Sequence, residues 1–187
     1  MLENGVVTNC APTLAGMKSG NLFSYRYTSW TAAMRELKDL NKKLNVRGVY
    51  VEALLWRKET VLIYTYRKAF LERDLQKEEV RKLLASYGYR ECDIISCLER
   101  LKERLTKYDC FPHEIGIFLG YPLEDVIGFI THKGKDCKLC GIWKVYGNVA
   151  EAGAMFRKLK KCSDIYVRVF HEGRSITQMT VDRKSVV

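Results

Sequence analysis

The fold is decided by residues 48–66, which read GVYVEALLWRKETVLIYTY. Two runs in this stretch, residues 48–56 and 60–66, are rich in Val, Ile, Leu and Tyr, which is typical of β-strands. The link between them, residues 57–59, is short enough to join the two strands as an antiparallel hairpin. Because both faces of each run are largely apolar, we expect the pair to lie centrally in a sheet that is covered on two sides.

Helices are expected both before and after this hairpin in the sequence, because apolar residues recur there at helical spacing. Ser29 is a suitable cap for a helix that reaches about Leu44. The other helices are expected over residues 76–87 and 91–108, in short stretches after Pro112 and Pro122, and from about residue 149. Further strands are expected over residues 141–146 and 165–170, and after the turn at residues 171–174.

The N-terminal segment 1–28 carries Pro12, Gly16 and Gly20, which interrupt any regular pattern. We therefore expect this segment to be irregular and to pack onto the remainder of the chain. The predicted fold is a single α/β domain over residues 1–187, with a mixed, partly antiparallel sheet of about five strands and helices on both faces.

The composition indicates a globular protein of a reducing compartment. Hydrophobic residues make up 47% of the chain and charged residues 29%, which is ordinary globular usage and argues against disorder. Residues 1–5 lack the basic and apolar regions of a signal peptide, and apolar runs stay well below the roughly 18 residues of a membrane span. The odd number of cysteines, seven, argues against a closed disulfide framework. We therefore predict a cytoplasmic protein with free thiols and no membrane association.

The chain has a formal net charge of +10, from 32 Lys and Arg against 22 Asp and Glu. A basic balance favours anionic partners. The basic residues are scattered along the sequence, which indicates mostly solvated surface. This dispersal argues against nucleic acid as the main partner, although it leaves that partner open.

A thiol and an ammonium flank a turn in residues 10–18, which read CAPTLAGMK. A helix N-terminus or a nearby Lys lowers the pKa of a thiol and makes it nucleophilic. Cys10 is therefore a candidate catalytic residue, and Lys18 is a candidate ligand-binding residue for an anion. The alternative is that Cys10 is a buried structural residue and Lys18 lies in solvent.

A histidine lies in the first turn of a short expected helix within residues 111–122, which read FPHEIGIFLGYP. His113 is a candidate catalytic residue because an imidazole can accept or donate a proton at neutral pH. Adjacent residues do not share a helix face, so we do not expect Glu114 to orient His113. Glu114 also suits the positive end of the helix dipole for structural reasons alone.

A lysine interrupts the apolar strand expected in residues 141–147, which read GIWKVYG. Alternation places Lys144 and Tyr146 on one face, where both are candidates for binding an anionic ligand. The alternative is an edge strand whose lysine protects against aggregation. Just before it, Cys137 and Cys140 have the spacing of a redox pair or of half a zinc site. Because the sequence holds no second such pair, we expect no metal site.

These motifs occur in the same order as in an uncharacterised family, found mainly in anaerobic clostridial bacteria and catalogued only as a domain of unknown function. The chain resembles that family over nearly its whole length, through C-x-P-T-L-x-G-x-K at residues 10–18, P-H-E-x-G-x-F-L-G-Y-P at 112–122 and G-x-W-K-V-Y-G at 141–147. The resemblance implies a small bacterial cytoplasmic protein. Since some members lie near flavodoxin-type or iron-transport genes, it also implies a link to redox or iron metabolism, with a redox protein such as a flavodoxin as a partner. It supplies no reaction and no catalytic residues, and Cys137 lies outside the shared motif.

The sequence contains neither the glycine-rich loops of nucleotide-binding proteins nor the nucleophile elbow of serine hydrolases. We therefore expect a small-molecule-binding or redox-linked protein with one anion-favouring site. In it, Cys10 is the nucleophile or redox thiol, His113 transfers protons, and Lys18 and Lys144 hold an anionic small molecule beside Tyr146. The cofactor stays unknown. The alternative is a non-enzymatic binding module for an acidic protein partner or nucleic acid.

Overall fold

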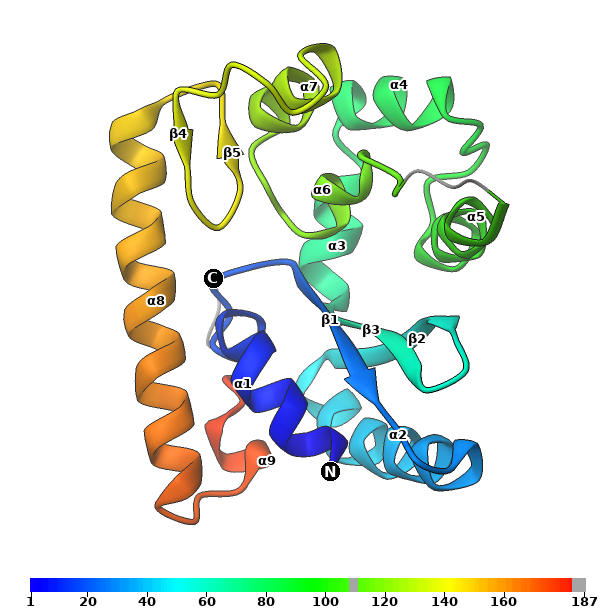
Figure 1. The fold of residues 1–187 in the computed structure, drawn as a ribbon, viewed down its shortest axis with the longest axis vertical. Coiled ribbons are helices and arrows are strands. Elements are labelled where there is room, and N and C mark those ends of the chain that lie inside the picture. Colours follow the sequence, from blue (N-terminus) through cyan, green and yellow to red (C-terminus); the bar gives the residue numbers. More distant parts are fainter. Residues whose placement is uncertain (108–110, 183–187) are drawn as a thin grey trace. The chain divides into compact units, whose positions relative to one another are not determined.

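The computed structural model describes residues 1–107 and 111–182 (Figure 1). The chain divides into two compact units, which are described separately below. The first unit contains residues 1–71 and the chain from residue 162 onward, and the second contains residues 72–161. Whether the two units fold together as a single domain stays a prediction.

The first unit contains a three-stranded antiparallel sheet. Its strands are β1 (Gly20–Arg26), β2 (Val49–Trp56) and β3 (Thr60–Arg67), in the order β1-β3-β2. The hairpin predicted from residues 48–66 is confirmed, and Trp56 pairs with Val61 beside its turn. The expectation that both strands are central is half right, because β3 lies between its neighbours while β2 forms an edge.

The expectation of an irregular segment 1–28 is wrong, because this segment forms helix α1 (Leu2–Leu14) followed by strand β1. Pro12 lies inside the helix, and the backbone leaves helical geometry at Cys10, so the chain bends there instead of ending the helix. Gly5 allows the close approach of this helix to β1, because a Cβ at this position would lie 2.9 Å from the ring of Phe23.

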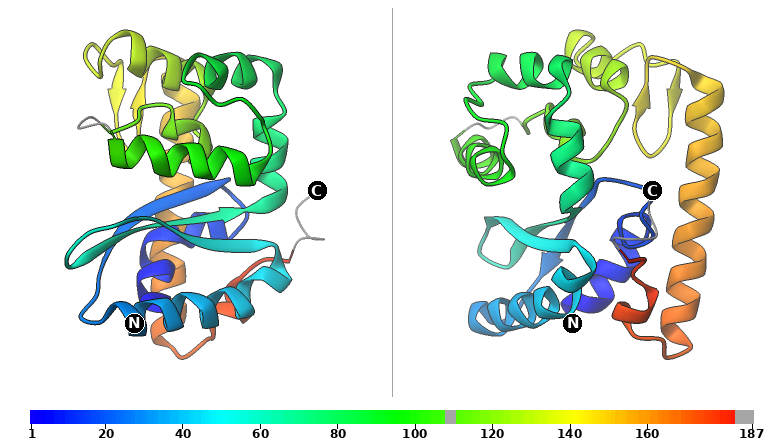
Figure 2. Two further views of the ribbon diagram at one scale, coloured as in Figure 1. Left: turned by 90° about the vertical axis from the view of Figure 1, so that its right-hand side faces the viewer. Right: turned by 180° about the vertical axis from the view of Figure 1, so that it is seen from behind.

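Three helices and the end of a fourth pack on one face of this sheet. Helix α1, helix α2 (Trp30–Leu44) and helix α9 (Ile176–Met179) cover side chains such as Val51 and Ile63. Figure 2 shows α1 and α2 on the same side of the strands. Helix α2 begins as predicted, because the Ser29 hydroxyl accepts a hydrogen bond from the amide of Ala32. It is followed by the short 3-10 helix η1 (Asn45–Arg47).

The last third of the chain corrects two further expectations. Residues 165–170 are not a strand but part of helix α8 (Val149–His171), and the strand expected after residue 174 is helix α9. Tyr166, Val169 and Phe170 pack against the core of the first unit, at the spacing of one helix face. The Tyr166 hydroxyl also donates a hydrogen bond to the Met179 carbonyl, over 2.8 Å.

The second unit is built mainly from helices. These are the end of α3 (Lys68–Leu75), then α4 (Glu78–Ser86), α5 (Ile94–Lys107), α6 (Ile115–Phe118) and α7 (Leu123–Thr131), with the first part of α8. Helices α4 and α5 confirm the predicted amphipathic stretches. The strand expected over residues 141–146 is reduced to a hairpin of β4 (Leu139–Cys140) and β5 (Lys144–Val145), which packs against α7. The fold is therefore mixed α/β as predicted, but its strands form a sheet of three and a hairpin of two, and not one sheet of five.

Candidate functional site

The second unit contains a cavity of about 360 Å³, which is mainly apolar. It is lined by residues of segment 111–121, by Asp125, Val126 and Phe129 of α7, and by residues 140–144 of the β4–β5 hairpin. The residues of the two motifs recognised in the middle and late sequence therefore meet around one cavity.

A buried carboxylate fixes the hairpin to α7. Asp125 is 3% exposed, and its Oδ1 accepts hydrogen bonds from the amides of Tyr146 and Gly147 at 2.7 and 2.8 Å. Its Oδ2 accepts a hydrogen bond from the indole Nε1 of Trp143 at 2.7 Å. Because three donors surround this buried side chain, Asp125 has a structural role and determines where Trp143 stands in the cavity wall.

Aromatic rings form much of the wall. The indole of Trp143 stacks on Tyr121, with centroids 5.0 Å apart, and meets the edge of Phe156 at 4.5 Å. This packing requires a glycine at position 141, because a Cβ there would lie 2.2 Å from the Phe156 ring. On another part of the wall, His113 makes an edge contact with Phe129 at 4.9 Å. The ring contacts give the cavity a defined shape before any ligand binds.

Two of the predicted site residues, His113 and Lys144, line this cavity together. Lys144 Nζ donates a hydrogen bond to the Gly134 carbonyl at 2.5 Å and lies 5.9 Å from the centroid of the Phe129 ring. An ammonium has three N–H donors, so this carbonyl bond orients the group while two donors remain for a ligand. His113 is exposed at the same wall, where its imidazole can donate or accept a hydrogen bond.

Tyr146 was predicted on the same wall but is not among the residues that line the cavity. Its hydroxyl donates to the Lys135 carbonyl at 2.9 Å, and its ring stacks on His132 with centroids 5.4 Å apart. Tyr146 therefore packs around the hairpin and does not extend into the cavity wall. Cys140 lines the cavity as an exposed free thiol, and Cys137 is a half-buried free thiol.

Cys10 and Lys18, the other predicted pair, lie in the first unit and are close enough to affect each other's pKa. Both are buried, at 0% and 6% exposure, which contradicts the loop position expected for the thiol. Burial raises the pKa of Cys10 to about 12, and the opposing effects of Thr65 and Lys18 are smaller. Among the described residues, the Thr65 hydroxyl makes no hydrogen bond of normal geometry. A thiol in this environment stays protonated at neutral pH, which argues against Cys10 as a nucleophile.

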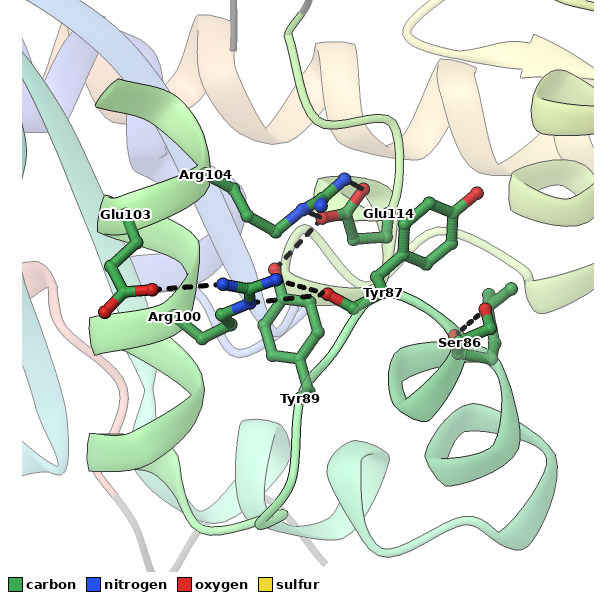
Figure 3. Close-up of polar contacts among 8 residues, drawn as sticks. Ser86, Tyr87, Tyr89, Arg100, Glu103, Arg104 and Glu114 are labelled. Atoms are coloured by element: carbon green, nitrogen blue, oxygen red, sulfur yellow. Dashed lines mark hydrogen bonds and ion pairs between the residues drawn. The ribbon is translucent and has the colours of Figure 1, made fainter. Parts of the chain in front are cut away.

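A second buried carboxylate, Glu114, has a role that differs from the expected helix-dipole contact. Its side chain is 0% exposed and forms an ion pair with Arg104 of α5, while the Tyr89 hydroxyl donates to its Oε1 at 3.1 Å (Figure 3). Burial, followed by the charge of Glu114, raises the pKa of Tyr89, which keeps its hydroxyl protonated as a donor. The adjacent His113 points to a different environment, as expected for neighbouring residues.

The residues that the sequence did not single out are Asp125, Phe129 and Tyr121. Each of them has an ordinary structural explanation. Asp125 lies in the first turn of a helix, where a carboxylate suits the helix dipole, and the two rings fit an apolar core. The available signal was the density of aromatic residues around residues 111–146. Among the described residues, no group of three His, Cys, Asp or Glu side chains is placed to hold a metal ion. The described helices are all too short or too polar to cross a membrane.

Comparison with known proteins identifies one family. Its model, described as a protein of unknown function (DUF3793), matches residues 6–180. This range includes all three sequence motifs and nearly all of both units. Searches of curated proteins and of solved structures found no match.

Proposed function

The chain belongs to the DUF3793 family, and we propose from its structure that the second unit binds a small molecule with an apolar body and one anionic group. The observation that carries this proposal is the cavity itself, in which aromatic walls meet an oriented ammonium. The apolar body would lie against Trp143 and Phe129, and the anionic group would reach Lys144 and His113.

The size and lining of the cavity support a small ligand. Its volume of about 360 Å³ lies within the range of small-molecule sites, roughly 300–1,000 Å³. Such sites are mostly apolar and contain a few polar groups that orient the ligand. Here the rings can contribute affinity by burying apolar surface, and the polar groups can select the ligand's charge.

The preference for an anion follows from the hydrogen bonds that the two charged groups of the cavity, Asp125 and Lys144, already make. The carboxylate of Asp125 already accepts three hydrogen bonds from its own unit, so it offers little to a cation. The ammonium of Lys144 makes one carbonyl hydrogen bond and keeps donors for a carboxylate or phosphate oxygen. A bond from an ammonium to such an oxygen is stronger than one between neutral groups.

Cys10 and Lys18 are not part of this proposal, because the residues that line the cavity all belong to the second unit. We further propose that the protein works in the bacterial cytoplasm, where its six described cysteines would stay reduced as free thiols. A redox partner such as a flavodoxin stays a prediction from the family resemblance. The exposed Cys140 at the cavity would be accessible to such chemistry.

Calorimetric titration with two matched probes tests the proposal. The probes are 2-naphthoate, which has an aromatic body and a carboxylate, and 2-naphthol, which is neutral at pH 7. We expect 2-naphthoate to bind the full chain more tightly. Lys144→Met should weaken 2-naphthoate about tenfold or more, as expected for a lost hydrogen bond to a charged group, and should leave 2-naphthol nearly unchanged.

Lys135→Met is the matched control, because Lys135 is an exposed lysine of the same unit outside the cavity lining. It should leave both affinities unchanged. The proposal is contradicted if neither probe binds, if Lys144→Met leaves the affinity for 2-naphthoate intact, or if Lys135→Met weakens it equally.

A further inference from the structure

The first unit presents three aromatic side chains beside the turn of its β2–β3 hairpin. Trp30 begins helix α2, Trp56 ends strand β2, and Tyr27 follows strand β1. The Trp56 ring lies 5.3 Å from Tyr27 in an edge contact and 6.0 Å from Trp30 in a tilted contact, measured between centroids. We call these three residues the aromatic face.

The aromatic face is rigidly supported. Tyr27 and Trp56 pack against the core of the first unit and are half-buried. The Tyr27 hydroxyl donates to the Arg57 carbonyl at 2.6 Å, and the Tyr27 amide donates to the Glu59 carbonyl at 3.0 Å. Both hydrogen bonds fix the ring to the hairpin turn.

The outermost ring is the one with the least packing. Trp30 is 54% exposed, and it stands against Trp56 at the beginning of its helix. Together with the two rings beside it, this indole offers a partner a continuous aromatic surface, since burying an aromatic ring removes about 150–250 Å² from water. The contact with Trp56 fixes the position of this ring, and its exposed side can contact a partner.

Basic residues adjoin the aromatic face along the chain. Arg57 and Lys58 form the hairpin turn, are exposed, and have no acidic partner within the described residues. Arg26 follows on the neighbouring strand with its side chain 80% exposed, and it lies 4.0 Å from Glu59, whose side chain is 67% exposed. An ion pair this exposed and this long contributes little, so Arg26 can exchange it for another anion.

We propose that the aromatic face and these basic residues bind single-stranded nucleic acid, with a base stacked on Trp30 and the neighbouring phosphates held by Arg26, Arg57 and Lys58. Exposed rings beside a basic surface are how proteins hold single strands, because every base has a face that can stack and every nucleotide has a phosphate. An acidic peptide would use the charges but would leave the exposed indole without a role. This inference is independent of the cavity in the second unit.

Fluorescence anisotropy of a labelled oligothymidylate of about twenty nucleotides tests this proposal on the full chain. Trp30→Leu keeps an apolar side chain and removes the aromatic face, so it should weaken binding at least fivefold. Arg57→Gln with Lys58→Gln should weaken binding and reduce the slope of log K against log salt concentration by about 1.4, since each phosphate of a single strand that is neutralised contributes about 0.7. Arg157→Gln with Lys158→Gln removes the same charge from exposed residues of α8 and should have a much smaller effect.

Two competitors distinguish the other occupants of this surface. Double-stranded DNA should compete weakly, because its bases are already stacked, and poly-L-glutamate should compete only through charge. The proposal is overturned if the oligothymidylate does not bind, if Trp30→Leu binds it as well as the unchanged protein, or if the control pair on α8 loses as much affinity. Equal competition by poly-L-glutamate, with no effect of Trp30→Leu, would assign the surface to an acidic protein partner.

Discussion

Burial shifts the pKa values of two residues of the N-terminal motif, Cys10 and Lys18, in opposite directions. It raises the pKa of the Cys10 thiol to about 12 and lowers the pKa of the Lys18 ammonium to about 8. In both cases the uncharged form is favoured, because a charge is poorly solvated inside the protein. The same residues that suggested a reactive pair in the sequence are therefore better explained as part of a buried structural cluster.

The first prediction concerns thiol reactivity in the native protein. Cys140 is exposed and Cys10 is 0% exposed, so iodoacetamide at pH 8 should modify Cys140 much faster. Mass spectrometry of peptides taken during the reaction gives both rates, and the denatured protein serves as the control. Equal rates for Cys10 and Cys140 in the native protein would show that Cys10 is accessible after all.

The second prediction concerns the pH dependence of stability. The pKa of Lys18 is about 8 in the folded chain and ordinarily 10.5, so the unfolded state binds the extra proton between these values. The contribution of Lys18 to the free energy of unfolding should therefore be least favourable below pH 8 and should become more favourable as the pH approaches 10. Lys18→Met removes this titration, whereas the contribution of Cys10 is present in both proteins.

Urea unfolding of the unchanged protein and of Lys18→Met at pH 7, 8, 9 and 10 measures this effect. The free energy of unfolding of Lys18→Met, relative to the unchanged protein, should fall by up to about 3 kcal/mol across that range. A difference that is constant with pH would mean that the folded protein does not lower the pKa of Lys18.

At the scale of elements, the ion pair between Glu114 and Arg104 joins the segment before α6 to α5. Glu114 is fully buried and the Arg104 side chain is 15% exposed, so removing one partner leaves a charge without compensation. Arg104→Met should lower the free energy of unfolding by about 3–5 kcal/mol, and the double variant Arg104→Met with Glu114→Gln should recover part of the loss.

Denaturant unfolding measures these variants. Lys82→Met is the control, because Lys82 pairs with Glu78 on the surface of α4, with both side chains mostly exposed, and should change stability little. The account of this buried pair is contradicted if Arg104→Met is no more destabilising than Lys82→Met, or if the double variant is less stable than the single one.

The elements that the sequence predicted correctly are those whose apolar residues fit only one periodicity, either that of a helix or that of a strand. Helix α2 and the hairpin of β2 and β3 follow their apolar spacing closely. Residues 165–170 satisfied two periods, because β-branched residues alternate there while Tyr166, Val169 and Phe170 also share a helix face. The strand prediction failed because a helix lets Tyr166, Val169 and Phe170 pack together against the core of the first unit. The local sequence does not show that this core lies beside them.

The candidate site was predictable to a similar extent. His113 and Lys144 were identified as polar residues in apolar surroundings, and both line the cavity. Asp125 was not identified, since its function depends on donors that are 18 to 22 residues away in the sequence. The buried, structural Cys10 was the alternative to a reactive thiol, but its position in a helix was not predicted, because Pro12 and Gly16 indicated a loop where the structure has a bent helix.

At the scale of the whole molecule, the prediction of a single domain can be tested with the chain's own fluorophores. The three tryptophans are divided between the units, with Trp30 and Trp56 in the first and Trp143 in the second. In Trp30→Phe with Trp56→Phe, fluorescence reports the second unit alone, while far-ultraviolet circular dichroism reports helices of both. We expect both signals to give the same urea midpoint, as one cooperative domain requires. Separate midpoints would show that the two units unfold independently.

The central claim is that the cavity of the second unit holds an anionic, largely apolar ligand, and protection of Cys140 from alkylation tests it most directly. Cys140 lines the cavity, whereas Cys92 is a half-buried thiol of the same unit outside the lining. We predict that saturating 2-naphthoate slows the alkylation of Cys140 several-fold and leaves the rate at Cys92 unchanged. Unchanged alkylation of Cys140, or equal slowing at both thiols, would contradict the assignment of the cavity as the binding site.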